Sequence, residues 1–261
     1  MFSKAQRCIY KRNQLANVIC QLRFPDILSI NHEEPAKFQE AIRDEFPIYS
    51  TQREGQPPKI TGAPGNLKIE TPPSTINYQF ASVDGRWRIN LTSKFISLSC
   101  SQYESWEEFA KRLDSPLAAF IQVYKPACFQ RIGLRYINII SKEALELTDI
   151  PFRSMIAPQY LGVLSFDSVE ETALNRCSFD TEISLAGGCS AKIHAGTGRV
   201  SRNGVADKEV KFIFDQDLFM SGNIPVNYSA GALQTLHGQA YPLFRGAITD
   251  LLHDAMDPET P

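Results

Sequence analysis

Apolar and polar residues alternate with a period of two along seven segments of this chain, and no other feature restricts its fold as strongly. Such alternation is typical of strands that bury one face, because successive side chains point to opposite sides of a sheet. The pattern predicts strands at 17–24, 76–83, 87–100, 129–140, 177–185, 189–194 and 210–219. The third is long enough to bend or split near Ser93, and Asp84-Gly85 before it predicts a tight turn.

Other segments carry the apolar periodicity of amphipathic helices. One covers about 35–46, and another begins at Ser105, where Ser105 and Glu108 form a capping box because each side chain can bond the other residue's free amide. The last covers 230–256, with Phe244 and Leu251 in its apolar stripe. We expect a kink in it at Pro242, because proline removes a helical hydrogen bond.

These elements predict an α+β protein made of two antiparallel halves, each a sheet covered by helices. Residues 1–145 show the order β-α-β-β-α-β, which is that of a ferredoxin-like unit. Residues 146–261 predict a three-stranded meander followed by a long C-terminal helix. Whether the two halves share one core stays open at this point.

The net charge of -2 gives no overall attraction to polyanions, so affinity for nucleic acid or a membrane would need a local patch. No apolar stretch approaches the roughly 20 residues of a membrane span, and none resembles the core of a signal peptide. We therefore expect a cytoplasmic protein that does not bind membranes. The sequence leaves its oligomeric state open.

Arginines gather on the outward phases of the strands predicted in the first half. Gly133 lies among them, and a glycine inside a strand often marks a place where a ligand or another backbone comes close. The planar guanidinium fork binds carboxylates and phosphates, so we predict a face for a protein partner or a polyanion. Alternatively, these arginines pair with Asp180 and Glu182 where the two halves pack together. The predicted face consists of Arg23, Arg86, Arg88, Arg131, Gly133 and Arg135.

A second polar cluster lies on the outward phases of the predicted meander, where Lys192 and Lys211 accompany the acidic residues. Carboxylates beside a histidine can hold a divalent ion or exchange protons in acid-base catalysis. The competing interpretation is an ordinary charged solvent face of an antiparallel sheet, which we favour. The cluster consists of Asp180, Glu182, His194 and Asp215.

Strong catalytic motifs are missing. The sequence has no Walker phosphate loop and no G-x-G-x-x-G, so we expect no cofactor. Glu209-Val210-Lys211 fits the acidic-x-lysine signature of metal-dependent nucleases, but a pattern this short arises by chance. We expect no bound metal and favour a protein without catalytic activity.

Three stretches resemble a sporadically distributed prokaryotic protein family of about 250–260 residues with no assigned activity. They are QLRFP at 21–25, RIGLRYIN at 131–138 and LHGQAYPLFRGAITDLLHDAM at 236–256. A patchy distribution is similar to that of genes on mobile and defence islands. The resemblance therefore implies a part in phage defence or toxin control, and it transfers no catalytic residues.

Our leading hypothesis is a non-catalytic binding or assembly protein that engages a protein partner through the arginine face. The first alternative is an RNA-binding or RNA-processing protein with tandem ferredoxin-like halves, since such halves often bind RNA on a sheet face. The second is a metal-dependent hydrolase built on Asp180, Glu182, His194 and Asp215.

The six cysteines are scattered without a C-x-x-C, and most lie in apolar strand-like runs, which predicts buried thiols in a reducing compartment. All six should be alkylated in denaturant without prior reduction. Intact mass after alkylation, with and without reductant, measures this. A pair of cysteines that reacts only after reduction would show that the prediction is wrong.

Overall fold

A single large antiparallel sheet dominates the computed structural model, which describes residues 2–54, 59–61, 68–70, 75–174, 176–202 and 204–259. It has nine strands among these residues, and every adjacent pair runs antiparallel. In spatial order the strands are β10 (Ser178–Ser184), β11 (Ser190–Gly198), β14 (Lys211–Ile224), β9 (Phe129–Ile140), β2 (Leu15–Arg23), β8 (Phe95–Cys100), β7 (Trp87–Leu91), β6 (Thr75–Ala81) and β3 (Ile48–Glu54).

Smaller elements surround this sheet. Two-stranded sheets pair β1 (Ile9–Tyr10) with β15 (Pro258–Glu259), β4 (Lys59–Thr61) with β5 (Lys68–Glu70), and β12 (Ser201–Arg202) with β13 (Val205–Ala206). The helices are α1 (Ser29–His32), α2 (Ala36–Ile42), α3 (Trp106–Tyr124), α4 (Lys142–Leu145), α5 (Ser229–Arg245) and α6 (Asp250–Ala255). Short 3₁₀ turns between Phe152 and Ala173 join α4 to β10. No helix in these described ranges is both long and apolar enough to cross a membrane.

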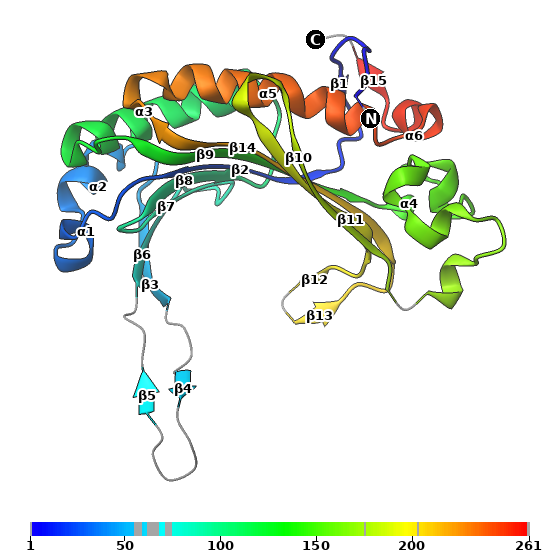
Figure 1. The fold of residues 1–261 in the computed structure, drawn as a ribbon, viewed down its shortest axis with the longest axis horizontal. Helices are drawn as coiled ribbons and strands as arrows, with labels where there is room; N and C mark the ends of the chain where they lie inside the picture. The colour runs from blue at the N-terminus through cyan, green and yellow to red at the C-terminus, as the bar shows by residue number, and fades with distance from the viewer. Residues whose placement is uncertain are drawn as a thin grey trace.

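The sheet bends into an arch, and its helices lie on the outer side. Figure 1 shows α3 and α5 side by side along the top of the sheet, while β6 and β3 descend at one end and β10 and β11 at the other. Alternate residues of each central strand point to these helices and are buried. The helix-facing residues of β2, β9 and β14 include Val18, Cys20, Leu22, Ile132, Leu134, Phe214 and Leu218.

The two predicted halves are joined into one sheet. Strand β14, from the second half, pairs with β9, from the first, in a register that runs from Phe212 opposite Ile140 to Ser221 opposite Arg131. The buried apolar residues of both halves form one contiguous cluster. The structure therefore does not divide into separate cores at residues 145 and 146.

The predicted α+β class and antiparallel strands are confirmed, but the ferredoxin-like unit is not. The segment expected as one strand over 87–100 is a hairpin, in which β7 and β8 pair with Leu91 opposite Ile96. An additional edge strand, β3, pairs with β6. The first half thus contributes six antiparallel strands, with the predicted turn at Asp84-Gly85 in place and Gly85 at a φ of 69°.

Ser105 caps α3 as expected, because its hydroxyl accepts a hydrogen bond from the Glu108 amide at 3.2 Å. The predicted C-terminal helix is interrupted, however, and the break does not lie at Pro242, which is inside α5. Helix α5 ends at Arg245. Two residues later, the carbonyl of Ala247 accepts a hydrogen bond from the Ala157 amide at 2.9 Å. The Thr249 side chain then caps α6.

The break also rotates the apolar stripe of the last turns. Leu252 is fully buried, whereas Leu251, which the sequence pattern placed in the core, is 39% exposed. Phe244 is buried as predicted, and it packs against Phe214 with ring centroids 6.0 Å apart. All six cysteines lie in the described part of the chain, and none is in a disulfide.

Leu251 and Leu252 form a matched pair for testing this packing. Leu252→Ala should lower the free energy of unfolding by about 2–5 kcal/mol, because it empties a buried site. Leu251→Ala should lower it by less than about 1 kcal/mol, because much of that side chain already contacts water. Urea denaturation of both variants measures the difference. Equal losses would contradict the position of α6.

Candidate functional site

The face of the sheet turned away from the helices is the candidate site, and we call it the open face. It lies on the inner, concave side of the arch (Figure 1). One row of directly paired residues crosses all nine strands on this face, and it holds only hydroxyl, amide, glycine and phenylalanine side chains. From β10 to β3 the row is Ser184, Ser190, Phe219, Gly133, Gln21, Ser97, Asn90, Gln79 and Ser50.

Charged residues beside this row pair with one another across strands. Asp215 accepts from the Nε of Arg135 at 2.8 Å, and Asp217 accepts from Arg131 at 2.7 Å and 2.8 Å. These pairs bridge β14 and β9, so they connect the two halves of the chain. The arginines therefore do pair between halves, but with Asp215 and Asp217 and not with Asp180 and Glu182.

Of the two carboxylates, that of Asp215 is the less exposed to solvent. The Asp215 side chain is only 12% exposed, and its hydrogen bond to Arg135 raises the pKa of that guanidinium. A partly buried carboxylate that lost this partner would be left without compensation for its lost hydration. Asp215 is thus a structural anchor for Arg135.

Gly133 leaves room for the side chain of Arg131. A Cβ atom at position 133 would lie 2.2 Å from the Nη1 atom of Arg131, whose guanidinium lies 4.5 Å from the centre of the Phe219 ring. The space that suggested an approaching ligand is therefore filled from within the chain. The guanidinium is fixed between Asp217 and Phe219, where electrostatic attraction and contact with the ring both hold it.

Two arginines of the predicted set remain unpaired on the open face. Among the charged residues of the described strands from β10 to β7, only Arg23 and Arg88 make no ion pair, and both are exposed. Strand spacing and rise place their Cα atoms roughly 15 Å apart. Arg23 lies opposite Arg131 on the neighbouring strand, and Arg88 lies opposite Ser99.

Arg86 lies elsewhere. It precedes β7, and its guanidinium binds Glu104 at 3.0 Å and Glu108 at 2.6 Å, in the loop and first turn of α3. It is also 5.3 Å from the ring centre of Trp87, which faces the helices. Arg86 therefore fastens α3 to the edge of the sheet and does not belong to the open face.

The second predicted cluster occupies the β10 end of the same face. His194 on β11 is paired with Asp180 on β10 and with Asp215 on β14. Its Nδ1 atom is 2.7 Å from Asp180. Lys192 is 3.4 Å from Glu182. A shallow hollow of about 530 Å³ lies over these residues. Within the described ranges, no group of three or more His, Cys, Asp and Glu residues is arranged to hold a metal ion.

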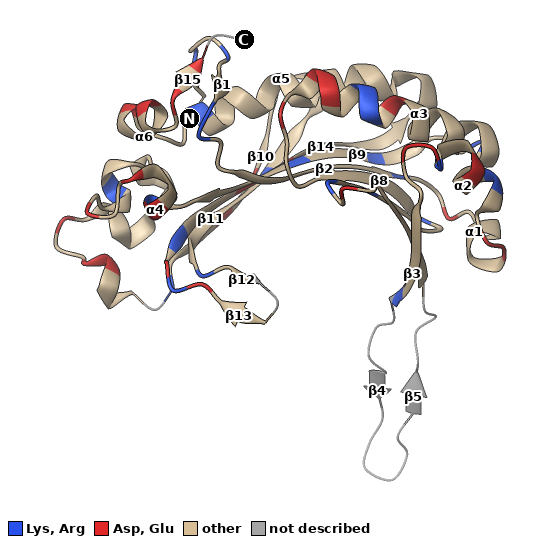
Figure 2. Cartoon of the chain, turned by 180° about the vertical axis from the view of Figure 1, so that it is seen from behind, with Lys and Arg blue, Asp and Glu red and all other residues tan. Residues whose placement is uncertain are grey.

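From β10 to β9 the open face carries acidic, basic, acidic and basic residues on successive strands, and Figure 2 shows Lys and Arg interspersed with Asp and Glu along the chain. Every carboxylate on the open face from β10 to β7 contacts a basic side chain within that described region, although the partner of Asp180 is His194, which is cationic only when protonated. When His194 is protonated, the charges of these pairs balance, and Arg23 and Arg88 are the basic residues left over.

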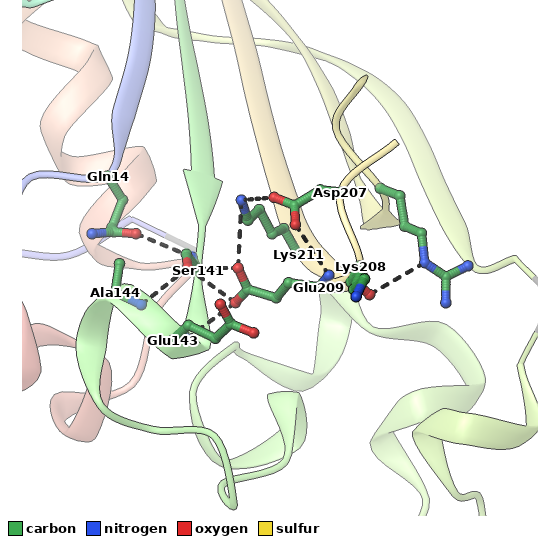
Figure 3. A network of polar contacts seen from close by, with 9 residues as sticks. Gln14, Ser141, Glu143, Ala144, Asp207, Lys208, Glu209 and Lys211 are labelled. Carbon is green, nitrogen blue, oxygen red and sulfur yellow. Dashed lines mark hydrogen bonds and ion pairs between the residues drawn. The ribbon is translucent and has the colours of Figure 1, made fainter. Parts of the chain in front are cut away.

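Glu209 and Lys211, the acidic-x-lysine pair, belong to a network at the start of β14 (Figure 3). The Glu209 carboxylate accepts hydrogen bonds from the Ser141 hydroxyl at 2.7 Å and from the Glu143 amide at 3.1 Å. Lys211 binds Asp207 and lies 3.4 Å from Glu209. Since Glu209 is only 8% exposed, these contacts indicate that it ties α4 to β14.

Sequence reasoning missed Asp217 and the uncharged row. Asp217 is at the same strand phase as Asp215, so the alternation itself was a usable signal. The row could not be recognised in advance, because it depends on the register of eight separate strand pairings. A scan against protein-family models and a search of curated proteins both gave no match.

Gly133→Ala tests the placement of Arg131. The added methyl group should displace the guanidinium from Asp217, because the two cannot occupy the same space. A double-mutant cycle on Arg131 and Asp217, measured by urea denaturation, should give a coupling of about 1 kcal/mol in the parent chain. In the Gly133→Ala background the coupling should fall to near zero. An unchanged coupling would contradict this geometry.

Proposed function

We propose that the protein is a non-catalytic binding protein, whose open face engages an acidic surface of a protein partner. The observation that carries this proposal is the pattern of unpaired charge. Arg23 and Arg88 are exposed and make no ion pair, whereas each of the other acidic and basic residues of the described strands from β10 to β7 contacts a side chain of the opposite type. A guanidinium fork pairs well with carboxylates, so acidic side chains are the complementary chemistry.

The internal ion pairs also favour binding, because they order arginine side chains of the open face before a partner docks. Arg131 is held by Asp217 and by contact with Phe219, and Arg135 is held by Asp215. Side chains that are already ordered lose less conformational entropy when a partner docks. The uncharged row adds hydroxyl and amide groups, which match the backbone and polar side chains of a protein surface.

RNA is a weaker match to this face. Nucleic-acid binding needs cations that are available to phosphates, but Arg131 and Arg135 are already paired with carboxylates. Phe219, an aromatic ring on the face, is covered by the guanidinium of Arg131 and is not free to stack on a base. Asp180 and Glu182 would repel a strand that extended towards β10.

A metal-dependent hydrolase finds less support than a binding protein. Asp215, the most enclosed carboxylate of the proposed cluster, is held by Arg135. Glu209 is held by Ser141 and Glu143. Both would have to give up their present partners before they could bind an ion. The family resemblance remains the support for placing the protein partner in a phage-defence or toxin-control system.

A photo-crosslinking amino acid in place of Gln21, at the centre of the open face, tests this function. In cells of the native host it should form a covalent adduct with a protein. Arg23→Glu/Arg88→Glu should abolish the adduct without changing the melting temperature, because exposed unpaired side chains add little to stability. Gels, nuclease treatment and mass spectrometry identify the adduct.

Lys37→Glu/Lys111→Glu is the matched control, since it changes net charge equally at two exposed positions on α2 and α3. It should leave the adduct intact. An adduct that nuclease removes would overturn the proposal in favour of RNA. The absence of any adduct at Gln21, or an adduct that survives the arginine double variant, would also overturn it.

A further inference from the structure

Strand β10 forms one edge of the nine-stranded sheet, where it pairs with β11 and with no other described strand. The amide of Leu185 donates to the carbonyl of Cys189 at 2.8 Å, and the carbonyl of Cys177 accepts from the Thr197 amide at 3.2 Å. Because hydrogen-bonded pairs alternate along an antiparallel ladder, the odd-numbered residues of β10 bond to β11. The even-numbered residues turn their amides and carbonyls to the outer edge.

This outer edge is open to another chain. The even-numbered residues of β10 are exposed, and no described residue hydrogen-bonds to their backbone groups. They are Ser178, Asp180, Glu182 and Ser184. Proteins often protect such an edge with proline, lysine or a bulge, and β10 contains none of the three. An added strand would satisfy the whole row of amides and carbonyls at once.

On the helix side of the sheet, apolar side chains lie beside this edge. Phe179 is half-buried, and its ring centroid is 5.5 Å from that of Tyr160. Cys177 donates to the carbonyl of Leu161 at 3.2 Å, and Val163, two residues further along, is 48% exposed. A strand added at the edge would therefore cover apolar surface as well as unpaired backbone.

The charges of β10 restrict how a second copy of the strand can pair with it. Two copies related by a two-fold axis present this strand antiparallel to itself. An axis at Asp180, Thr181 or Glu182 would place carboxylates directly opposite carboxylates, which destabilises a strand pair. An axis at Phe179 instead places Arg176 opposite Glu182 of the second copy.

The register centred on Phe179 uses the groups that β10 leaves open. Arg176 is exposed and makes no ion pair within the described ranges, and Cys177 beside it already continues the ladder with β11. Each copy contributes one arginine and receives one, so two ion pairs form. Ser178 lies opposite Asp180 of the second copy, and the two Phe179 rings meet at the axis as a cross-strand aromatic pair. Even-numbered residues face even-numbered residues, as hydrogen bonding at the outer edge requires.

We infer that the protein forms a two-fold dimer in which β10 pairs with β10 of a second copy, with the axis at Phe179. The two sheets join into one, and both open faces lie on the same side of it, because the axis is perpendicular to the sheet. Arg23 and Arg88 lie on β2 and β7, away from this edge, so the dimer is independent of the proposed acidic partner. The contact covers a single strand from each copy, so we expect the dimer to dissociate on dilution.

Sedimentation velocity of the full chain, from micromolar to millimolar concentration, tests the inference. The parent should pass from monomer to dimer as its concentration rises. Arg176→Glu and Glu182→Arg should each raise the dissociation constant at least about tenfold, because each places like charges opposite one another. The double variant Arg176→Glu/Glu182→Arg should restore the parental value, since it exchanges the two charges.

Lys111→Glu is the matched control. It changes the net charge as Arg176→Glu does, at an exposed position on α3, and it should dimerise as the parent does. Arg176→Glu should also keep the parental melting temperature, because Arg176 makes no hydrogen bond or ion pair with the described residues. A weaker dimer in this variant is therefore a change at the interface and not a loss of fold.

A disulfide reports the register directly. Thr181 lies opposite Cys177 of the second copy in a pair without hydrogen bonds, where Cα atoms are about 4.5 Å apart, within the range that a disulfide spans. Mild oxidation of Thr181→Cys should therefore link the introduced thiol to Cys177 of the second copy, as mass spectrometry of its peptides would show. Ser184→Cys carries its thiol on the open face and should not form a link to Cys177.

The inference is overturned if the parent stays monomeric at the highest concentration, or if neither charge reversal weakens the dimer. It is also overturned if the double variant dimerises no better than the single variants. A dimer in which Thr181→Cys does not link to Cys177 has another register, and this too contradicts the inference.

Discussion

The pairing of β9 with β14 is the contact on which the rest of the structure depends. It joins strands that lie about 80 residues apart in the chain and merges the two halves into one sheet with one core. The same pairing places Arg131 and Arg135 opposite the aspartates that neutralise them. Without this register, both arginines and both aspartates would lose their present partners.

The two faces of the paired strands β9 and β14 make different contacts, because successive side chains of a strand point to opposite sides of the sheet. Asp215 and Asp217 point to the open face and bind arginines, while Gln216 between them is buried on the side of the helices. Likewise, Arg135 is on the open face, whereas the Tyr136 hydroxyl lies 2.9 Å from the Nδ1 atom of His237 on α5. The open face and the contacts to α5 thus lie back to back on the same short segments.

Period-two patterns predicted the antiparallel strands and the shared face of Arg23, Arg88, Arg131 and Arg135, because alternation is a local property. They could not predict Arg86, whose position depends on Glu104 and Glu108 of a distant segment. Edge strand β3 was missed because its polar residues show no clear alternation. Two buried polar positions also had a signal that went unused: Asn138 and Gln216 are polar residues at apolar phases of their strands.

Native-state hydrogen exchange across a denaturant series tests the central claim that both halves form one cooperative sheet. Amides of β2, β9 and β14 should exchange only through global unfolding, and their exchange free energies should converge with the free energy of unfolding of the whole chain. If the amides of residues 146–261 instead open together at a lower free energy while β2 and β9 stay protected, the halves are independent units. The charge pairs of the open face would then lose their structural basis.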